Sequence, residues 1–318
     1  MTIERMPRAQ LLSAADALPF RGLEPDSLTR LDRGAFVRTG EWQEHLREAR
    51  LRTLADVVHR RIDPEVGGAF SHETALALHG LPVFDGFDER VHMIAPGAHP
   101  RHGAARVVRH HCPLPPADTC RIGDLAVTTL ERTVFDVVRL TSPAAAIVAM
   151  DAALHVRAAP HPGESFDAAA EERFRADIRG RIADAVGARG IRQARFVVEF
   201  ADGRAESPGE SLLRWRVWQT SLGDVEPQWR VELPGGRHAR LDLALPHRRL
   251  WLEFDGAVKT TDPLMLAGRM PAEVLAAQDA RQRAVERATG WRCVRFGWAD
   301  VLSLDAFTDA LRRAALTR

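Results

Sequence analysis

The stretch RLDLALPHRRLWLEFDGAVKTTDP, residues 240–263, constrains the fold more than any other part of the chain. It holds two apolar runs joined by a short polar segment, and each run carries acidic residues. With a turn centred between His247 and Arg248, residues whose numbers add to 495 lie opposite one another in an antiparallel pair. Since side chains alternate between faces, one face would then be wholly apolar and form core. Its members are Leu241, Leu243, Leu245, Leu250, Leu252 and Phe254.

The opposite face of this predicted hairpin is crowded with charge. The same register places Asp242 opposite Glu253, and Arg240 opposite Asp255. Like charges directly opposed across a strand pair are destabilising. A shared divalent cation would offset the repulsion, because Mg²⁺ prefers carboxylate oxygens as ligands. The alternative is a solvated acidic face in which Arg240 pairs with Asp255.

The composition is that of a globular chain. At 318 residues it is long enough for two or three domains, and its 45% hydrophobic and 27% charged residues are ordinary values. No apolar run approaches the roughly 20 residues that a membrane span needs. The first residues, MTIERMPRAQ, lack the apolar stretch of a signal peptide. We therefore expect a cytoplasmic protein that does not enter a membrane.

Cysteine and histidine spacing leaves two interpretations open. The three cysteines contain no CxxC pair, which indicates neither a disulfide framework nor a zinc ribbon. The run RHHC at 109–112, with Cys120 nearby, forms either a metal site or a half-exposed strand. His72 and His79 either share a helix face or are structural residues at the helix ends.

The charge pattern directs attention to arginine patches and to one lysine. A net charge of +1 gives no argument for nucleic-acid binding from bulk charge. Of the 44 basic residues, all are arginine except Lys259. Lysine and arginine are not interchangeable where a compact ammonium is needed. Lys259 is therefore a candidate functional residue, unless it is a chance remainder of a composition that favours arginine.

The first half of the chain predicts two modules. Helices over 7–18 and 23–33 followed by a short strand indicate a winged-helix-like module at 1–45, with Arg30, Arg33 and Arg38 contacting DNA, or else a packed helical pair. Residues 46–156 predict an α/β region. It contains a helix capped by Ser71, strands at 90–96, 105–113 and 125–129, and helices at 131–140 and 143–155. Residues 157–204 predict a helical linker.

Residues 205–318 predict a third unit with a definite element order. A helix begins at Ser207, with Pro208 at its first position, and is stopped by Gly223. Strands at 227–233, 238–245 and 249–255 follow. A helix from 271, a strand at 291–296 and a final helix complete the unit. The whole chain is therefore expected to be α/β in the α+β sense.

Two resemblances arise from these segments. The C-terminal runs ESPGES, RLDLALP, LEFDGAVK and GWRCVRF resemble the PD-(D/E)XK nuclease fold, and more closely the very-short-patch-repair-like endonuclease domains at the C-terminus of actinobacterial proteins. The N-terminal runs LTRLDRGAFVR, SHETALALHGLP and LAVTTLERTVFDVVR are similar to the AbiEi-type winged-helix region of type IV antitoxins.

The nuclease resemblance implies a catalytic set. Asp242 and Glu253 would bind Mg²⁺ or Mn²⁺ together with the Phe254 carbonyl, with Glu210 as an outer acid and Lys259 as the catalytic lysine. Glu210 also fits a capping box, Ser207-x-x-Glu210, in which its side chain would bond the backbone N–H of Ser207 at the start of the helix.

The chain departs from the family pattern in two places. Asp255 stands where the lysine usually follows the second acid, and Gln278 with Asp279 replace a Glu-Lys pair of related domains.

Two functions therefore follow from the sequence. The first is a metal-dependent DNA endonuclease. The alternative is a DNA-binding regulator of antitoxin type whose nuclease fold is inactive. DNA is the expected partner of both, and a cognate toxin is left open.

Overall fold

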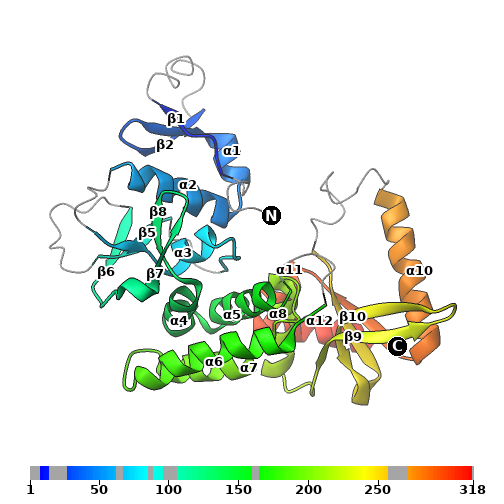
Figure 1. Cartoon of the computed structure of the whole chain (residues 1–318). Coiled ribbons are helices and arrows are strands. Elements are labelled where there is room, and N and C mark those ends of the chain that lie inside the picture. Colours follow the sequence, from blue (N-terminus) through cyan, green and yellow to red (C-terminus); the bar gives the residue numbers. More distant parts are fainter. Residues whose placement is uncertain are drawn as a thin grey trace. The chain divides into compact units, whose positions relative to one another are not determined.

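The chain has a mixed α+β architecture made of two compact units (Figure 1). Unit 1 comprises Met1–Ala153 and Ala168–Ala201, and unit 2 comprises Leu154–Asp167 and Asp202–Arg318. This computed structural model describes residues 8–13, 27–61, 67–84, 89–95, 106–159, 165–256 and 271–316. Among the described residues, no helix is long and apolar enough to cross a membrane.

Unit 1 begins with a three-stranded sheet. The sheet has the order β1-β3-β2, and the helices α1 and α2 follow it. The bounds of these elements are β1 Leu12–Ser13, β2 Leu28–Asp32, β3 Ala35–Arg38, α1 Thr39–Glu44 and α2 Arg47–His59.

The helices expected over 7–18 and 23–33 are wrong where the structure describes them. Leu12–Ser13 is a strand, and Leu28–Asp32 pairs antiparallel with β3. Gly34, which we interpreted as a helix stop, has a φ of 75° and lies in the turn of this hairpin. A glycine with positive φ ends a helix or turns a hairpin equally well, so its presence alone does not separate the two.

The second sheet of unit 1 has five strands in the order β6-β5-β4-β8-β7. The strands and helices expected in this region are confirmed, and the strands β4 and β7 are additions. Ser71 precedes α3 as expected, but its side chain makes no capping hydrogen bond. The elements are β4 Ala69–Phe70, α3 His72–Leu78, β5 Val91–Ile94, β6 Val107–His110, the 3₁₀ helix η4 Pro116–Asp118, β7 Thr119–Ile122, β8 Leu125–Thr128, α4 Leu130–Leu140 and α5 Pro143–Ala158.

The two sheets of unit 1 share one core. A single hydrophobic cluster contains Leu31 and Val37 of the first sheet, Leu54 of α2, and Phe70 and Val127 of the second sheet. The segments 1–45 and 46–156, which we expected as separate modules, are therefore joined by common burial of apolar surface.

The predicted linker region holds α6 (Ala168–Asp184) and α7 (Ile191–Phe200), and both helices belong to unit 1. Buried charges fix α6 to the rest of the unit. Arg181 of α6 lies 2.7 Å from Asp118, whose other oxygen accepts from Arg132 at 2.8 Å. Arg132 also pairs with Asp136 at 2.8 Å. Removing one member of such a network leaves a buried charge without its counterpart, which is strongly destabilising.

Unit 2 follows the element order expected from the sequence. One four-stranded sheet has the order β12-β11-β10-β9, in which β11 and β12 run parallel and the other pairs are antiparallel. The helix α8 contacts β10 and β11, and α10 contacts β9 and β12. The elements are α8 Pro208–Gln219, β9 Glu226–Leu233, β10 Arg237–Leu245, η5 Pro246–Arg248, β11 Leu250–Phe254, α10 Pro271–Thr289, β12 Arg292–Phe296, α11 Trp298–Val301 and α12 Leu304–Leu316.

The predicted register of the hairpin is confirmed near its turn. Leu243 pairs with Leu252, Ala244 with Trp251 and Leu245 with Leu250, and each pair of numbers adds to 495. Five of the six residues assigned to the apolar face are buried, and Leu250 is half-buried.

The far end of the hairpin differs from the prediction. The predicted register puts Leu241 and Trp251 on different faces of the hairpin. In the structure both lie in one hydrophobic cluster with Val285 of α10. The ladder between β10 and β11 ends at Leu243 and Leu252. β10 stays paired with β9 on both sides of this point, Leu241 with Trp229 and Leu243 with Pro227. The irregularity lies between them, where the pairing skips Asp242 and Gln228 and Gln228 has a φ of 53°.

We predict that Gly209→Ala destabilises unit 2. A Cβ at Gly209 would overlap the ring of Phe254, which is held edge-on against Trp298. Alanine favours a helix over glycine by about 1 kcal/mol, but overpacking costs roughly 1–3 kcal/mol. The net change in the free energy of unfolding, measured by denaturant titration, should therefore be a loss.

Gly180→Ala is the matched control for this substitution. Gly180 is also inside a helix, α6, and an added Cβ meets nothing within 4 Å. The control should be neutral or stabilising. Equal effects of the two substitutions would contradict the packing described for Gly209.

Candidate functional site

The carboxylate of Asp242 lies against the end of β11. Its Oδ2 accepts a hydrogen bond of 2.8 Å from the backbone N–H of Phe254. The strand pairing near the turn directs Asp242 and Glu253 into neighbouring positions on adjacent strands, and Asp242 bonds the backbone immediately after Glu253. Both side chains are half-buried. The structure thus places Asp242 against the backbone of Phe254, directly after Glu253, and a metal site at these residues stays a prediction.

Glu253 has one oxygen in an ion pair and one without a partner. Arg281 of α10 lies 3.1 Å from Oε2, and the Glu253 side chain is only 12% exposed. Oε1 is buried and has no hydrogen-bond partner among the residues that the structure describes. A buried acceptor without a partner is unfavourable by roughly 1–3 kcal/mol, more when it is charged. A cation at this oxygen would offset that cost, so the donor set fits a divalent metal.

Glu210 lies at the start of α8 in a hydrogen-bond network of its own. Its oxygens accept from the Ser207 hydroxyl at 2.8 Å, the Glu206 N–H at 3.0 Å and the Gln228 amide at 3.0 Å. Ser207 in turn accepts from the Glu210 N–H at 3.3 Å. The cap is therefore formed by Ser207, as predicted, while Glu210 reaches the backbone one residue earlier than a capping box requires.

Burial raises the pKa of Glu210, and the hydrogen bonds from Glu206, Ser207 and Gln228 oppose that rise. A buried acid with a raised pKa is a frequent feature of functional sites, although structural networks produce it as well. Glu210 thus lies at the start of α8 without the exact contact of a capping box, and its role as outer acid stays a prediction.

The charges beside the two acids pair differently from the solvated-face alternative. Arg240 pairs with Glu206 at 2.9 Å, and Asp255 pairs with Arg295 at 3.2 Å, so Arg240 and Asp255 do not pair with one another. The long reach of arginine lets each side chain find an acid on a neighbouring element instead of the one opposite.

The helix α10 supplies residues that the family pattern did not predict. Gln278 and Asp279, which replace the expected Glu-Lys pair, are part of α10, and Arg281 from the next turn binds Glu253. Gln282 accepts from Arg295 at 3.2 Å. Lys259, the predicted catalytic lysine, lies outside the described residues.

The three arginines predicted to contact DNA lie on the hairpin of β2 and β3 and not on a helix. Arg30, Arg33 and Arg38 are all exposed. Leu28 pairs with Arg38 and Arg30 with Phe36, so Arg30 and Arg38 are diagonal neighbours across the two strands. Arg30 and Arg38 therefore lie on one face of the hairpin, and Arg33 lies in its turn.

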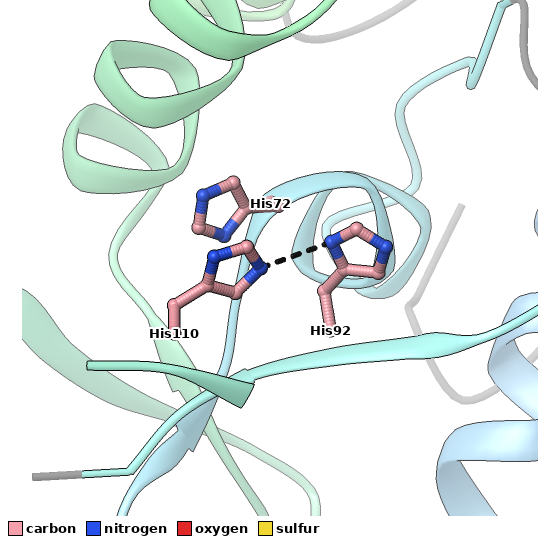
Figure 2. A group of neighbouring side chains, drawn as sticks. All are labelled: His72, His92 and His110. Carbon is pink, nitrogen blue, oxygen red and sulfur yellow. Dashed lines mark hydrogen bonds between the residues drawn. The ribbon is translucent and has the colours of Figure 1, made fainter. Parts of the chain in front are cut away.

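A cluster of three histidines in unit 1 was missed by the sequence analysis. Figure 2 shows the side chains of His72, His92 and His110 side by side. One nitrogen of each lies within 4.8 Å of those of the other two. His72 begins α3, His92 is on β5 and His110 is on β6. The parallel ladder sets Ile94 beside His110 and His92 beside Val108, which places His92 and His110 on one face.

Local structure positions His72 over the other two rings. The Ser71 N–H donates to the His92 carbonyl at 2.9 Å, which ties the start of α3 to β5. The His72 ring stacks on His110 with a centroid distance of 3.7 Å (Figure 2). Its Nδ1 lies 2.9 Å from the Ser71 hydroxyl, and its Nε2 is buried without a hydrogen-bond partner.

The surroundings keep His72 neutral. Burial, together with the nearby His110 and His92, lowers the pKa of His72 to about 2. Burial and His92 also lower the pKa of His110, against an opposing effect of Asp136 and Glu73. Neutral imidazole is the form that binds a metal.

The other metal alternatives drawn from the sequence have different partners. Cys112 accepts from Arg132 at 3.3 Å, and Cys120 approaches the Thr128 carbonyl at 3.9 Å. His79 bonds the Thr128 carbonyl at 2.8 Å, which is a structural role. Sequence spacing did not indicate the histidine cluster because its members are 20 and 18 residues apart, on separate elements.

Comparison with known proteins gives relatives without a described activity. No family model matches the chain. It is 30% identical over 222 residues to two proteins of Mycobacterium tuberculosis, covering 70% of this chain and 71% of each relative. These are the uncharacterized protein Rv2248 of strain H37Rv and the uncharacterized protein MT2308 of strain CDC 1551.

We predict that Glu210→Gln changes how stability depends on pH. The folded-state pKa of Glu210 is raised, so its contribution to stability is present below the unfolded pKa and is lost as pH rises through the folded pKa. Glutamine does not titrate, so the variant does not lose this contribution to stability as the pH rises. Its stability relative to the unsubstituted protein should therefore increase from acidic to neutral pH in denaturant titrations with EDTA. A stability difference that stays constant over that pH range would contradict the raised pKa.

Proposed function

The chain belongs to the same family as the mycobacterial proteins Rv2248 and MT2308, and we propose that its unit 2 is a metal-dependent endonuclease domain that hydrolyses phosphodiester bonds in DNA. The observation that carries the proposal is the pair of acids at β10 and β11. Asp242 bonds the Phe254 N–H, and the neighbouring Glu253 holds a buried oxygen without a partner. The element order of unit 2 and its resemblance to PD-(D/E)XK domains support it further.

Asp242, Glu253 and the Phe254 carbonyl would hold Mg²⁺ or Mn²⁺ in this proposal. A divalent ion bound there supplies Lewis-acid activation of water and of the phosphate. Arg281 balances the charge of Glu253 and also donates to the Arg240 carbonyl, and its guanidinium would be suited to hold a phosphate oxygen. Lys259 would stabilise negative charge that develops on the phosphate.

Glu210 has a role of its own in the proposed reaction, because its pKa is raised. A carboxyl group that keeps its proton at higher pH is suited to donate to, or to position, a water near the two acids.

The free cysteines Cys112, Cys120 and Cys293 agree with the reducing cytoplasm, which is the location that we propose.

The endonuclease proposal is tested on supercoiled plasmid with Mg²⁺, Mn²⁺ or EDTA. The full chain should nick plasmid only with metal, and Asp242→Asn or Glu253→Gln should lower the rate on the order of 100-fold or more. Asp224→Asn is the matched control, because Asp224 is an exposed acid of unit 2 outside the site, and it should leave the rate unchanged. Absence of nicking with every metal would overturn the enzyme proposal.

A DNA-binding regulator of antitoxin type is the second candidate. The exposed arginines Arg30, Arg33 and Arg38 on one hairpin of unit 1 favour it, since clustered guanidinium groups suit phosphate contacts. In this case the nuclease fold of unit 2 is inactive, and Arg281 permanently occupies the place of the metal.

We predict that replacing Arg30, Arg33 and Arg38 together with glutamine weakens binding to duplex DNA. The slope of log affinity against log salt should also fall by up to about 0.9 for each phosphate that the variant no longer neutralises. The control variant replaces Arg189, Arg192 and Arg195 with glutamine. These arginines of unit 1 are also exposed, and their replacement removes the same amount of positive charge. A loss of affinity in the control as large as in the hairpin variant would mean that only net charge matters.

A further inference from the structure

We propose that His72, His92 and His110 form a binding site for one divalent transition-metal ion of the zinc class, separate from the acids of unit 2 (Figure 2). This proposal does not depend on the endonuclease activity. It rests on the geometry of the three imidazoles and on two unfavourable features of His72.

The geometry brings three imidazole nitrogens to one place. His92 Nδ1 and His110 Nε2 are 3.1 Å apart. Two nitrogens bound at about 2.05 Å to a tetrahedral zinc ion are separated by about 3.3 Å. The pair is thus already at the spacing of two ligands of one ion. His72 completes a set whose ligand atoms all lie within 4.8 Å of one another.

The position of His72 is unfavourable unless something binds it. His72 is 3% exposed, and its Nε2 is buried with no hydrogen-bond partner in the described part of the chain. It also has a φ of 52°, in the left-handed region that a residue with a Cβ rarely adopts. Unsatisfied buried nitrogens and strained backbone both concentrate at functional sites. A bound ion would satisfy the nitrogen.

The charges around the cluster are compatible with a cation. The Glu73 carboxylate lies 3.3 Å from His92 Nδ1 and supplies negative charge at its edge. Asp136 also acts on His110, and it balances Arg132 and Arg139. His92 and His110 are half-buried, so the ion has a route from solvent.

The ligand type selects the ion. Three neutral imidazoles favour zinc, cobalt, nickel or copper over magnesium, which prefers oxygen ligands. Because His72 and His110 stack face to face in the structure, one ring must turn to direct its lone pair at the ion. Since His72 begins α3 and the other two lie on β5 and β6, the ion would cross-link three elements of unit 1.

The experiment titrates Co²⁺ and Zn²⁺ into the untagged full chain, with visible absorption, calorimetry and thermal melts as readouts. We expect one equivalent to bind, with the d–d absorption of nitrogen-ligated Co²⁺ and a rise in the melting temperature. His92→Gln and His110→Gln should weaken binding on the order of 100-fold or more. His111→Ala is the matched control, because His111 is the exposed neighbour of His110, and it should bind as the unsubstituted chain does.

Asp242→Asn tests whether Co²⁺ binds at the histidines and not at the acids of unit 2. This variant should give the same Co²⁺ spectrum as the unsubstituted chain. X-ray absorption on the Zn²⁺-loaded unsubstituted chain needs no variant to fold, and it should give imidazole nitrogens with no sulfur. Sulfur ligation, absence of binding, or binding that persists in both histidine variants would each overturn the proposal.

Discussion

The pairing of β10 with β11 is the constraint on which unit 2 depends. Leu243, Leu245 and Leu252 are buried, and a shift of one residue would bring Asp242 and Glu253 into their place. Burying these charges without partners would be prohibitive, so the apolar side chains fix where the acids stand. The core thus determines the candidate site: Asp242 reaches the Phe254 N–H, and Glu253 is left with one oxygen that no group of the described chain satisfies.

The ion pair between Glu253 and Arg281 has a different meaning in each of the two candidate functions. If a divalent ion occupies the acids, the Glu253–Arg281 pair is a resting state in which arginine substitutes for the ion. If no ion binds, that pair is the permanent structure, and the acids are a remnant held by an ion pair. The departure at Asp255 agrees with either function, because Arg295 compensates its charge. The histidine cluster of unit 1 adds a site of different ligand chemistry, in which nitrogen replaces oxygen.

Sequence alone predicted the parts of the fold whose signals are local and unambiguous. The cap at Ser207, the alternation of 243–245 with 250–252, and the helices α4, α5 and α10 were all predictable. The hairpin of β2 and β3 was not, since Gly34 permits a helix end and a turn alike. The placement of Leu241 was not predicted either, because no sequence signal shows the irregularity in the pairing of β10 with β9 at Asp242 and Gln228. Arg281 and the three histidines come from distant segments, and no local pattern shows which side chains tertiary packing brings together.

Anomalous diffraction from crystals of the full chain grown with Mn²⁺ tests the central claim most directly. The account predicts a peak bound by the carboxylates of Asp242 and Glu253, with Arg281 displaced from Glu253. Crystals that contain Mn²⁺ in the solvent but show Arg281 still paired with Glu253, and no peak between the two acids, would contradict it.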